Sequence, residues 1–379
     1  MFETKKVRET GVLVTVAPKF QSDEKTQEYL EELAFLSETI DLDILKWFSQ
    51  KLEHPEPKTF IGKGKLQELK EYVKAKQVKN VIFDDDLSPS QMRNLERELK
   101  ATIYDRSLLI LEIFLKRAKT TQAKTQVELA RFQYLLPRLT RMWTHLERQR
   151  GGTATRGGAG EKEIETDRRN IRNQINVLRK KLDKIETQAA TRRKSRDGVV
   201  RVALVGYTNA GKSSLMRRIS KEKVYAKDEL FATVDSTVRK VVINNVPFLL
   251  SDTVGFIRKL PHDLIESFKS TLMEVKEADI LLHVIDVSNP AYEEHVQVVE
   301  NTLDEIDASD IPVIRVYNKA DKLDEDALLD HHIDVINPDS IYVSAVTKFH
   351  MQEFRELLGK ETAKLHYKIY PNYLNTETY

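Results

Sequence analysis

The stretch Val200–Ser213, VRVALVGYTNAGKS, decides the fold of this 379-residue chain. Its first six residues are mostly apolar and predict a buried strand. Gly206–Ser213 follows at once and matches the phosphate-loop pattern GxxxxGK[ST]. Ser214–Ile219 then continues as a helix. A strand, this loop and a helix in that order predict a P-loop nucleotide-binding domain of α/β class.

The loop chemistry explains why these residue types are needed. Glycine permits a tight turn whose backbone N–H groups point at phosphate, and the following helix adds a favourable dipole. We expect Lys212 to reach the β- and γ-phosphates and Ser213 to give a hydroxyl ligand to Mg²⁺. The predicted phosphate-binding residues are Gly206, Tyr207, Thr208, Asn209, Ala210, Gly211, Lys212, Ser213 and Ser214.

Three later motifs, each after a predicted strand, specify guanine. The predicted switch II is Asp252, Thr253, Val254 and Gly255, which would place a carboxylate near Mg²⁺ and a glycine at the γ-phosphate. In NKAD, the carboxylate of Asp321 can accept both hydrogen bonds from the guanine N1–H and amine, whereas adenine presents a mismatched edge. The predicted guanine-binding residues are Asn318, Lys319, Asp321, Ser344, Ala345 and Val346.

The predicted switch I lies between the phosphate loop and switch II. It is Phe231, Ala232, Thr233, Val234 and Asp235. We expect Thr233 to be the second hydroxyl ligand of Mg²⁺, ordered only with the γ-phosphate present, so that the metal set is Ser213 and Thr233. Thr237 is the alternative.

The residues that activate water are less evident. Phe256 follows Gly255, where some GTPases place a water-orienting glutamine, and a phenyl ring cannot polarise water. A repositioned switch, a bound cation or a partner must then contribute. Asn209 resembles the asparagine with which some translation-related GTPases hold a monovalent cation, which makes K⁺ a candidate. His262 is a possible base but is more simply a surface histidine, and His283 is expected to be a strand residue.

Upstream of the loop, residues 11–106 alternate strand-like and helix-like stretches. The predicted strands are Gly11–Ala17, Val78–Phe83 and Thr102–Tyr104, and the predicted helices are Lys25–Leu36 and Gln91–Leu99. This alternation predicts a small α/β domain with a mainly parallel sheet.

Two amphipathic helices follow. One apolar stripe consists of Leu129, Phe132, Leu136, Leu139, Trp143 and Leu146, and the other of Ile164, Ile171, Ile175, Leu178, Leu182 and Ile185. We expect an antiparallel hairpin with a kink or break at Pro137. The glycine-rich Arg150–Gly160 between them predicts a tip loop, in which Arg148, Arg150 and Arg156 could pair with RNA phosphates. A plain flexible linker is the alternative.

The charge distribution agrees with a polyanionic partner. Between residues 116 and 196 there are 22 Lys and Arg against 8 Asp and Glu, a balance of +14 in a chain of net charge +2. A solvated helical face is the alternative.

The chain has no cysteine, which excludes disulfides and thiolate metal sites. No signal-like segment or run of about 18–20 apolar residues occurs, so we expect a cytoplasmic protein without stable membrane insertion.

Several stretches together resemble the HflX family of ribosome-associated GTPases. They are Thr59–Lys65 (TFIGKGK), Phe83–Pro89 (FDDDLSP), Val127–Leu139 (VELARFQYLLPRL), the arginine–glycine loop, Glu165–Arg169 (ETDRR), GYTNAGKS, FATVD and Asp252–His262 (DTVGFIRKLPH). The resemblance implies a GTPase, expected to be monomeric, that binds the large (50S) ribosomal subunit and its RNA and splits stalled or idle ribosomes. The N-terminal domain and hairpin would enter the ribosome. Family members have also been credited with ATP binding, for which IGKGK is a poor phosphate loop.

The expected organisation has four parts. They are an α/β domain (1–107), a helical hairpin with a basic tip (108–197), a Ras-like GTPase domain (198–366) and a short tail (367–379). The tip departs from the family at Thr153–Thr155 and Gly158–Ala159, where glycine and proline are usual, which puts ribosome splitting in question. The alternatives are a GTP-timed subunit-assembly or RNA-binding factor without splitting activity, and an ATP-driven RNA remodeller.

Overall fold

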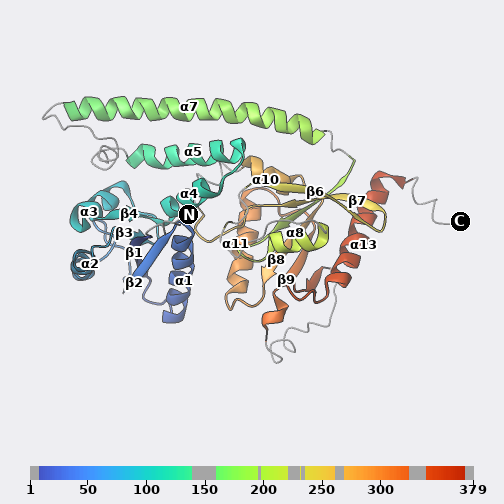
Figure 1. Ribbon diagram of the computed structural model, residues 1–379, viewed down its shortest axis with the longest axis horizontal. Coiled ribbons are helices and arrows are strands. Elements are labelled where there is room, and N and C mark those ends of the chain that lie inside the picture. The colour runs from blue at the N-terminus through green and yellow to red at the C-terminus, as the bar shows by residue number, and fades with distance from the viewer. Residues whose placement is uncertain are drawn as a thin grey trace, which may run out of the picture. The chain divides into compact units, whose positions relative to one another are not determined.

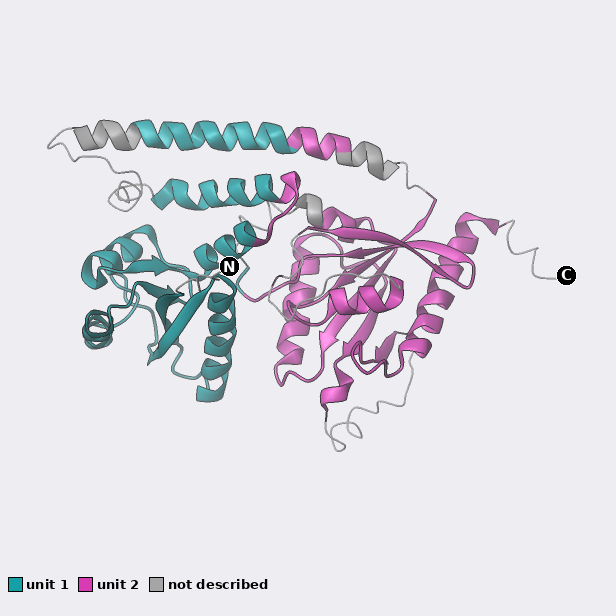
Figure 2. Cartoon of the chain, viewed as in Figure 1, with its two compact units in different colours: residues 1–116, 124–182, 259–267 teal, residues 117–123, 183–258, 268–379 magenta. Residues whose placement is uncertain are grey.

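The computed structural model describes residues 8–138, 159–194, 198–220, 231, 235–260, 269–323 and 339–371. They fall into two compact units (Figure 2). The first comprises residues 1–116, 124–182 and 259–267, and the second comprises residues 117–123, 183–258 and 268–379, with the undescribed residues of each range left aside. Neither unit is one continuous stretch of chain, because each is made of three separate ranges of residues.

The first unit is built around a four-stranded parallel sheet. Its elements are β1 (Glu9–Ala17), α1 (Asp23–Thr39), β2 (Leu42–Lys51), α2 (Lys63–Lys76), β3 (Asn80–Phe83), α3 (Pro89–Leu99), β4 (Thr102–Tyr104) and α4 (Arg106–Arg117). The strand order is β2-β1-β3-β4, and every pair is parallel (Figure 1). The predicted mainly parallel sheet is confirmed. Edge strand β2 and helix α2 were not predicted, because their polar residues mask the apolar pattern.

Local signals set the helix boundaries in this unit. At the start of α3, the Ser88 side chain accepts from the Gln91 N–H while the Gln91 side chain accepts from the Ser88 N–H. This capping box satisfies two backbone donors, and Pro89 occupies the first helical position, where no N–H is needed. Helix α3 therefore begins at Pro89, two residues before the predicted start at Gln91. Helix α4 begins at Arg106, so the predicted boundary at residue 107 falls inside this helix.

The hairpin consists of α5 (Thr121–Leu135), a 3₁₀ turn η1 (Leu136–Arg138) and α7 (Ala159–Lys194). The predicted break at Pro137 is confirmed, because α5 ends two residues before it. Leu129 of α5 is buried against α7, where the partners are Ile175, Leu178 and Leu182, and the two helices run side by side (Figure 1). Leu139, Trp143 and Leu146 lie outside the described residues, as does the side chain of Ile164.

The second unit contains a six-stranded sheet of order β10-β9-β8-β5-β7-β6. Its elements are β5 (Val200–Val205), α8 (Lys212–Ser220), β6 (Thr237–Ile243), β7 (Val246–Asp252), α10 (Lys269–Lys276), β8 (Ile280–Asp286), α11 (Tyr292–Glu305), β9 (Val313–Asn318), η2 (Ala320–Lys322), β10 (Ser340–Tyr342) and α13 (Met351–Ile369). Only the β6–β7 pair is antiparallel. Helix α13 passes the predicted domain boundary at residue 366, because its turns continue without a break to Ile369.

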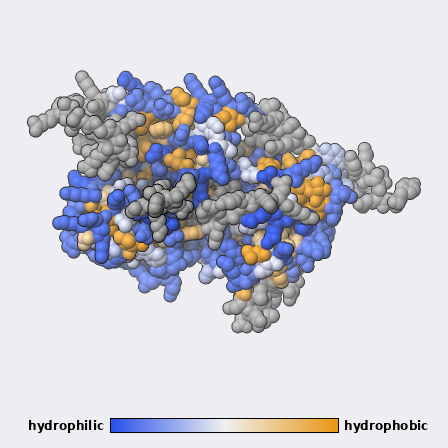
Figure 3. All heavy atoms as spheres, viewed as in Figure 1, coloured by the Kyte–Doolittle hydropathy of each residue, from blue (hydrophilic) through white to orange (hydrophobic). Residues whose placement is uncertain are grey.

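The face of the molecule in Figure 3 is largely hydrophilic, with orange patches separated by blue. The exposed large apolar residues include Val177 on α7 and Val242 on β6. Among the described residues, no helix combines the length and the apolar character that crossing a membrane requires.

Candidate functional site: the phosphate loop and its neighbours

The phosphate loop follows β5, an interior strand paired with β7 and β8. Gly206 has φ +149°, and a Cβ there would lie 2.2 Å from the Val284 carbonyl oxygen of β8. Gly211 has φ +99°, and its Cβ would lie 2.2 Å from the Asn318 Nδ2 of β9. Both positions therefore require glycine for two reasons, backbone conformation and the closeness of neighbouring strands.

Lys212 is held above this loop by backbone carbonyls. Its side chain is buried, and its Nζ donates to the carbonyl oxygens of Gly206 at 3.0 Å and Tyr207 at 2.9 Å. Burial lowers the pKa of Lys212 to about 8, and the negative charge of Asp252 partly opposes that shift. A buried ammonium at the N-terminus of helix α8 is an arrangement that favours a phosphate group.

Ser213 and Asp252 meet beside the loop. The Ser213 hydroxyl donates to Asp252 Oδ2 at 2.6 Å, and Asp252 is the last residue of β7 and almost fully buried. Hydroxyl and carboxylate oxygens are the donors that Mg²⁺ prefers, so this pair fits that ion. Within the described part of the chain, no group of three or more His, Cys, Asp or Glu forms a separate metal site.

Switch II lies against the phosphate loop as a short ladder. The Phe256 N–H donates to the Gly206 oxygen at 3.1 Å, and the Thr208 N–H donates to the Phe256 oxygen at 2.7 Å. A Cβ on Gly255 would lie 2.8 Å from Thr208 Cα. Thr253 and Val254 are buried behind it, and the Thr253 hydroxyl donates to the Leu204 oxygen. Phe256 is itself buried, so it packs the loop instead of facing water.

The base-side motifs are joined through Asn318. Its Nδ2 donates to the Ala210 oxygen at 2.9 Å, and its Oδ1 accepts from the Ala345 N–H at 3.2 Å. Asp321 is exposed beyond it, while the Ser344 hydroxyl accepts from the Val346 N–H at 3.2 Å. One buried amide thus links three segments that are distant in the chain.

Two supports of this region were missed in the sequence. Lys319 has φ +64° and pairs with Asp286 at 2.6 Å, and Arg218 of α8 donates to the Ala345 oxygen at 2.7 Å. Of these residues, only Asp286 could have been found from the sequence, because a polar residue at the end of a buried strand is a candidate for a site at the edge of the sheet. Nothing local in the sequence indicates the role of Arg218.

Switch I is described only at its two ends. Phe231 is buried, and its N–H donates to the Thr208 hydroxyl at 3.0 Å. Asp235 accepts a hydrogen bond from the Lys119 N–H at 2.9 Å. Ala232, Thr233 and Val234 lie outside the described residues, whereas the alternative Thr237 begins β6 opposite Asp252.

The histidines and the remaining loop residues have clear placements. His283 is buried within β8, and burial lowers its pKa to about 3, so it is a neutral strand residue as predicted. His262 lies outside the described residues. Asn209 adopts φ +61°, and the Tyr207 ring stacks on His295 of α11 with ring centroids 3.7 Å apart. That stacking partner was not predicted.

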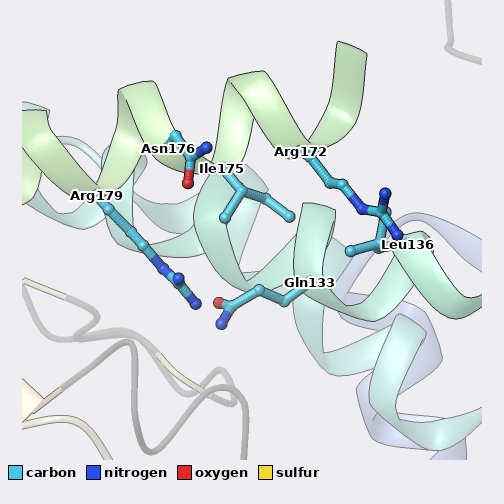
Figure 4. A pocket seen from close by; sticks show the side chains of 6 residues that line it. All are labelled: Gln133, Leu136, Arg172, Ile175, Asn176 and Arg179. Carbon is cyan, nitrogen blue, oxygen red and sulfur yellow. The ribbon is translucent and has the colours of Figure 1, made fainter. Parts of the chain in front are cut away.

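The proposed RNA-facing arginines of the tip, Arg148, Arg150 and Arg156, lie outside the described residues. The described part of the hairpin instead has a groove of about 320 Å³, which is lined by Gln133, Leu136, Arg172, Ile175, Asn176 and Arg179. Arg172 and Arg179 extend from α7 on either side of Ile175 (Figure 4).

Comparison with known proteins agrees with these features. The families described as "GTP-binding GTPase N-terminal", "GTP-binding GTPase Middle Region" and "50S ribosome-binding GTPase" match residues 27–115, 117–196 and 201–319. A Flavobacterium psychrophilum protein named GTPase HflX is 47% identical and covers 96% of this chain and 92% of its own. The chain belongs to the HflX family. The Escherichia coli GTPase HflX is 44% identical over 92% of this chain and 81% of its own.

A solved structure also resembles this HflX chain over nearly its whole length. The complex of SsGBP with GDP has 27% sequence identity and a TM-score of 0.53, and the match covers 94% of this chain and 99% of that one. Family membership and the P-loop domain together establish that the protein binds GTP and hydrolyses it to GDP and phosphate.

Proposed function

We propose that this GTPase binds the large ribosomal subunit in the cytoplasm, as a monomer, and splits stalled or idle ribosomes in its GTP-bound state. The observation that carries the proposal is the GTPase domain itself, whose matching family is described as ribosome-binding. The balance of +14 between residues 116 and 196 supports it, since cationic side chains displace counterions from RNA phosphates.

For the nucleotide site we propose the following roles. Lys212 and the loop amides bind the β- and γ-phosphates, and the hydroxyls of Ser213 and Thr233 bind Mg²⁺, with Asp252 on the same side of the ion. Mg²⁺ would neutralise charge on the phosphates. The direct bond between Ser213 and Asp252 supports this assignment, because both oxygens already converge on one place.

For guanine recognition we propose three roles. Asp321 accepts from the guanine N1–H and amine, while Asn318 and Lys319 support the base site from β9. Ser344, Ala345 and Val346 form the opposite wall. The exposure of Asp321 supports this role, since its carboxylate stays open to a ligand while Asn318 is engaged with the protein itself.

Hydrolysis needs a group that orients water, and the buried Phe256 ring cannot supply it. We propose that a monovalent cation such as K⁺, held with the help of Asn209, stabilises charge in the transition state. A cation near developing negative charge is a common form of electrostatic catalysis. The position of Asn209 within the phosphate loop supports this role, because a cation held there would lie close to the bound phosphates.

The hairpin would supply the RNA-binding surface. We propose that Arg148, Arg150 and Arg156 contact ribosomal RNA at the tip. Away from the tip, Arg172 and Arg179 of α7 line the groove in Figure 4 and are exposed. Their planar guanidinium groups can each form a pair of hydrogen bonds to a phosphate.

Sedimentation of intact ribosomes tests the main proposal. With the protein and a non-hydrolysable GTP analogue we expect free subunits, whereas GDP should leave ribosomes intact. Co-sedimentation without free subunits would favour the assembly-factor alternative and refute splitting. A matched variant carries Arg148, Arg150 and Arg156 changed to alanine, which should weaken ribosome binding and its salt dependence while sparing GTP affinity. Unchanged ribosome binding by this variant would show that the tip loop is only a flexible linker.

A further inference from the structure

Asp235, the last residue of switch I, bonds to the start of a helix 115 positions away. Its Oδ2 accepts from the Lys119 N–H at 2.9 Å and from the Thr120 N–H at 3.3 Å. Its Oδ1 accepts from the Thr120 hydroxyl. All three residues lie in the second unit. Switch I is therefore joined to the segment that enters α5.

This contact lies at a helix N-terminus that needs acceptors. The first N–H groups of a helix have no partner within it, and the helix dipole makes that end positive. The Thr120 hydroxyl oxygen accepts from the Ala123 N–H at 3.1 Å and so caps the first turn locally. Asp235 orients that hydroxyl and adds a negative charge. The cap of α5 is thus shared between Thr120 and a residue of switch I.

The other end of switch I is anchored on the phosphate loop. The Phe231 N–H donates to the Thr208 hydroxyl, and Phe231 itself is buried. Four residues of extended chain span at most about 14 Å. Thr233 stands in the chain midway between the two anchors, so we expect a displacement of Thr233 to be transmitted to Asp235 over two residues.

Helix α5 continues directly to the surface proposed for RNA. Its first residues belong to the second unit and the remainder, to Leu135, belongs to the first unit. Gln133, near its end, lines the groove that also contains Arg172 and Arg179. Its far end is fastened by the Tyr134 hydroxyl, which donates to the buried Asp105 at 2.7 Å. With that end held, the first turn is the part of α5 left to respond to switch I.

We propose that Asp235 is a positioning residue that makes the first turn of α5 depend on the bound nucleotide. The γ-phosphate orders switch I, which holds Asp235 on Thr120 and keeps the cap. Loss of the γ-phosphate releases Asp235, and the first turn frays. The inference rests on the proposed role of Thr233 and extends the function of the hairpin from binding RNA to sensing GTP.

Hydrogen exchange on the full chain without ribosomes tests this coupling. The amides of Lys119, Thr120 and Ala123 should exchange about tenfold more slowly with a non-hydrolysable GTP analogue than with GDP. Thr120→Val removes the bridging hydroxyl at an exposed position and should abolish the difference at Ala123 at unchanged GTP affinity, while the Lys119 N–H still donates to Asp235. Thr120→Ser keeps the hydroxyl and should restore it, and Asp235→Ala should abolish it.

The control is Asp279→Ala, because Asp279 also accepts a hydrogen bond from a backbone N–H, that of Arg201 at 2.7 Å. This variant should keep the nucleotide-dependent difference at α5. Equal exchange with both nucleotides in the unaltered protein would overturn the proposal. A difference at the Ala123 amide that persists in Thr120→Val would also overturn it. The result is independent of ribosome splitting, so failure of the sedimentation experiment leaves it standing.

Discussion

Each of the two sheets of this chain has polar residues at the edge where its parallel strands end, yet the surroundings of these residues differ between the two units. In the first unit Asp84 follows β3 and Asp105 follows β4. In the second unit Asp252 ends β7 and Asn318 ends β9. Ligands of open α/β sheets bind at this edge, so position alone makes both edges candidates.

In the first unit the chain supplies its own partners for this edge. The buried Arg106 donates to Asp84 at 2.8 Å and also pairs with Glu32. Asp105 accepts from the Leu108 N–H at 2.8 Å and from the Tyr134 hydroxyl. These residues hold helices in place, and their oxygens are occupied.

In the second unit the strand-end groups are also engaged within the chain, since Asp252 accepts from the Ser213 hydroxyl and both ends of the Asn318 amide are bonded to the backbone. Lys212 rests on loop carbonyls that a phosphate can replace, and Asp321 is exposed. The two edges therefore differ in the groups beside the strand ends, and we propose that Lys212 and Asp321 bind the ligand in the second unit. This comparison gives no support to a second nucleotide site at the edge of the N-terminal sheet.

The largest expected effect is on nucleotide selection. Asp321→Asn should weaken GTP binding by roughly 10²–10⁴-fold, since two hydrogen bonds to a charged group are lost. Binding of xanthine nucleotides should increase, because xanthine has a carbonyl where guanine has the amine. Calorimetry with both nucleotides measures this. Asp84→Asn, at the other edge, should leave GTP affinity unchanged, and a loss there would break the comparison.

The next effect is on stability of the first unit. Arg106→Leu should lower the free energy of unfolding by about 3–5 kcal/mol, because it leaves buried carboxylates without their cation. Adding Asp84→Leu should recover part of the loss. Lys70→Met, which removes an exposed pair with Glu98, should cost less than about 1 kcal/mol. Equal effects in chemical denaturation of Arg106→Leu and Lys70→Met would contradict the anchoring role.

A smaller effect is expected at the hairpin. Tyr134→Phe removes the hydroxyl that donates to Asp105 and should destabilise the first unit by about 1–3 kcal/mol. GTP affinity should be unaffected. Tyr72→Phe is the matched control, since Tyr72 is a half-buried tyrosine whose ring packs on Phe48. Thermal unfolding of both variants measures the difference, and equal shifts would refute a specific role for the Tyr134–Asp105 bond.

The smallest effect concerns pH. Phosphate requires the charged form of Lys212, whose pKa of about 8 in the nucleotide-free protein means that the charge is lost as pH rises through that value. GTP affinity should therefore be about tenfold lower at pH 9 than at pH 7, with uptake of about one proton on binding at the higher pH. Calorimetry in buffers of different ionisation enthalpy tests this, and an affinity independent of pH would show that Lys212 stays charged.

The sequence by itself was enough to predict the phosphate loop, the mainly parallel character of the N-terminal sheet and the break at Pro137, since each follows from a local pattern of residues. Strand, glycine loop and helix are contiguous, and proline in the interior of a helix kinks or ends it. The chain also revealed through Phe256 that the usual glutamine is missing, although only the structure showed the ring buried against the loop.

Tertiary structure alone decided the partners of charged and polar groups. Asp235 meets Thr120, Arg106 joins Asp84 to Glu32, and Lys319 pairs with Asp286. These contacts have no periodicity, because each depends on where distant elements come together. Whether a strand-end carboxylate serves a ligand or anchors a helix is set by those long-range contacts, so the motif alone cannot specify it.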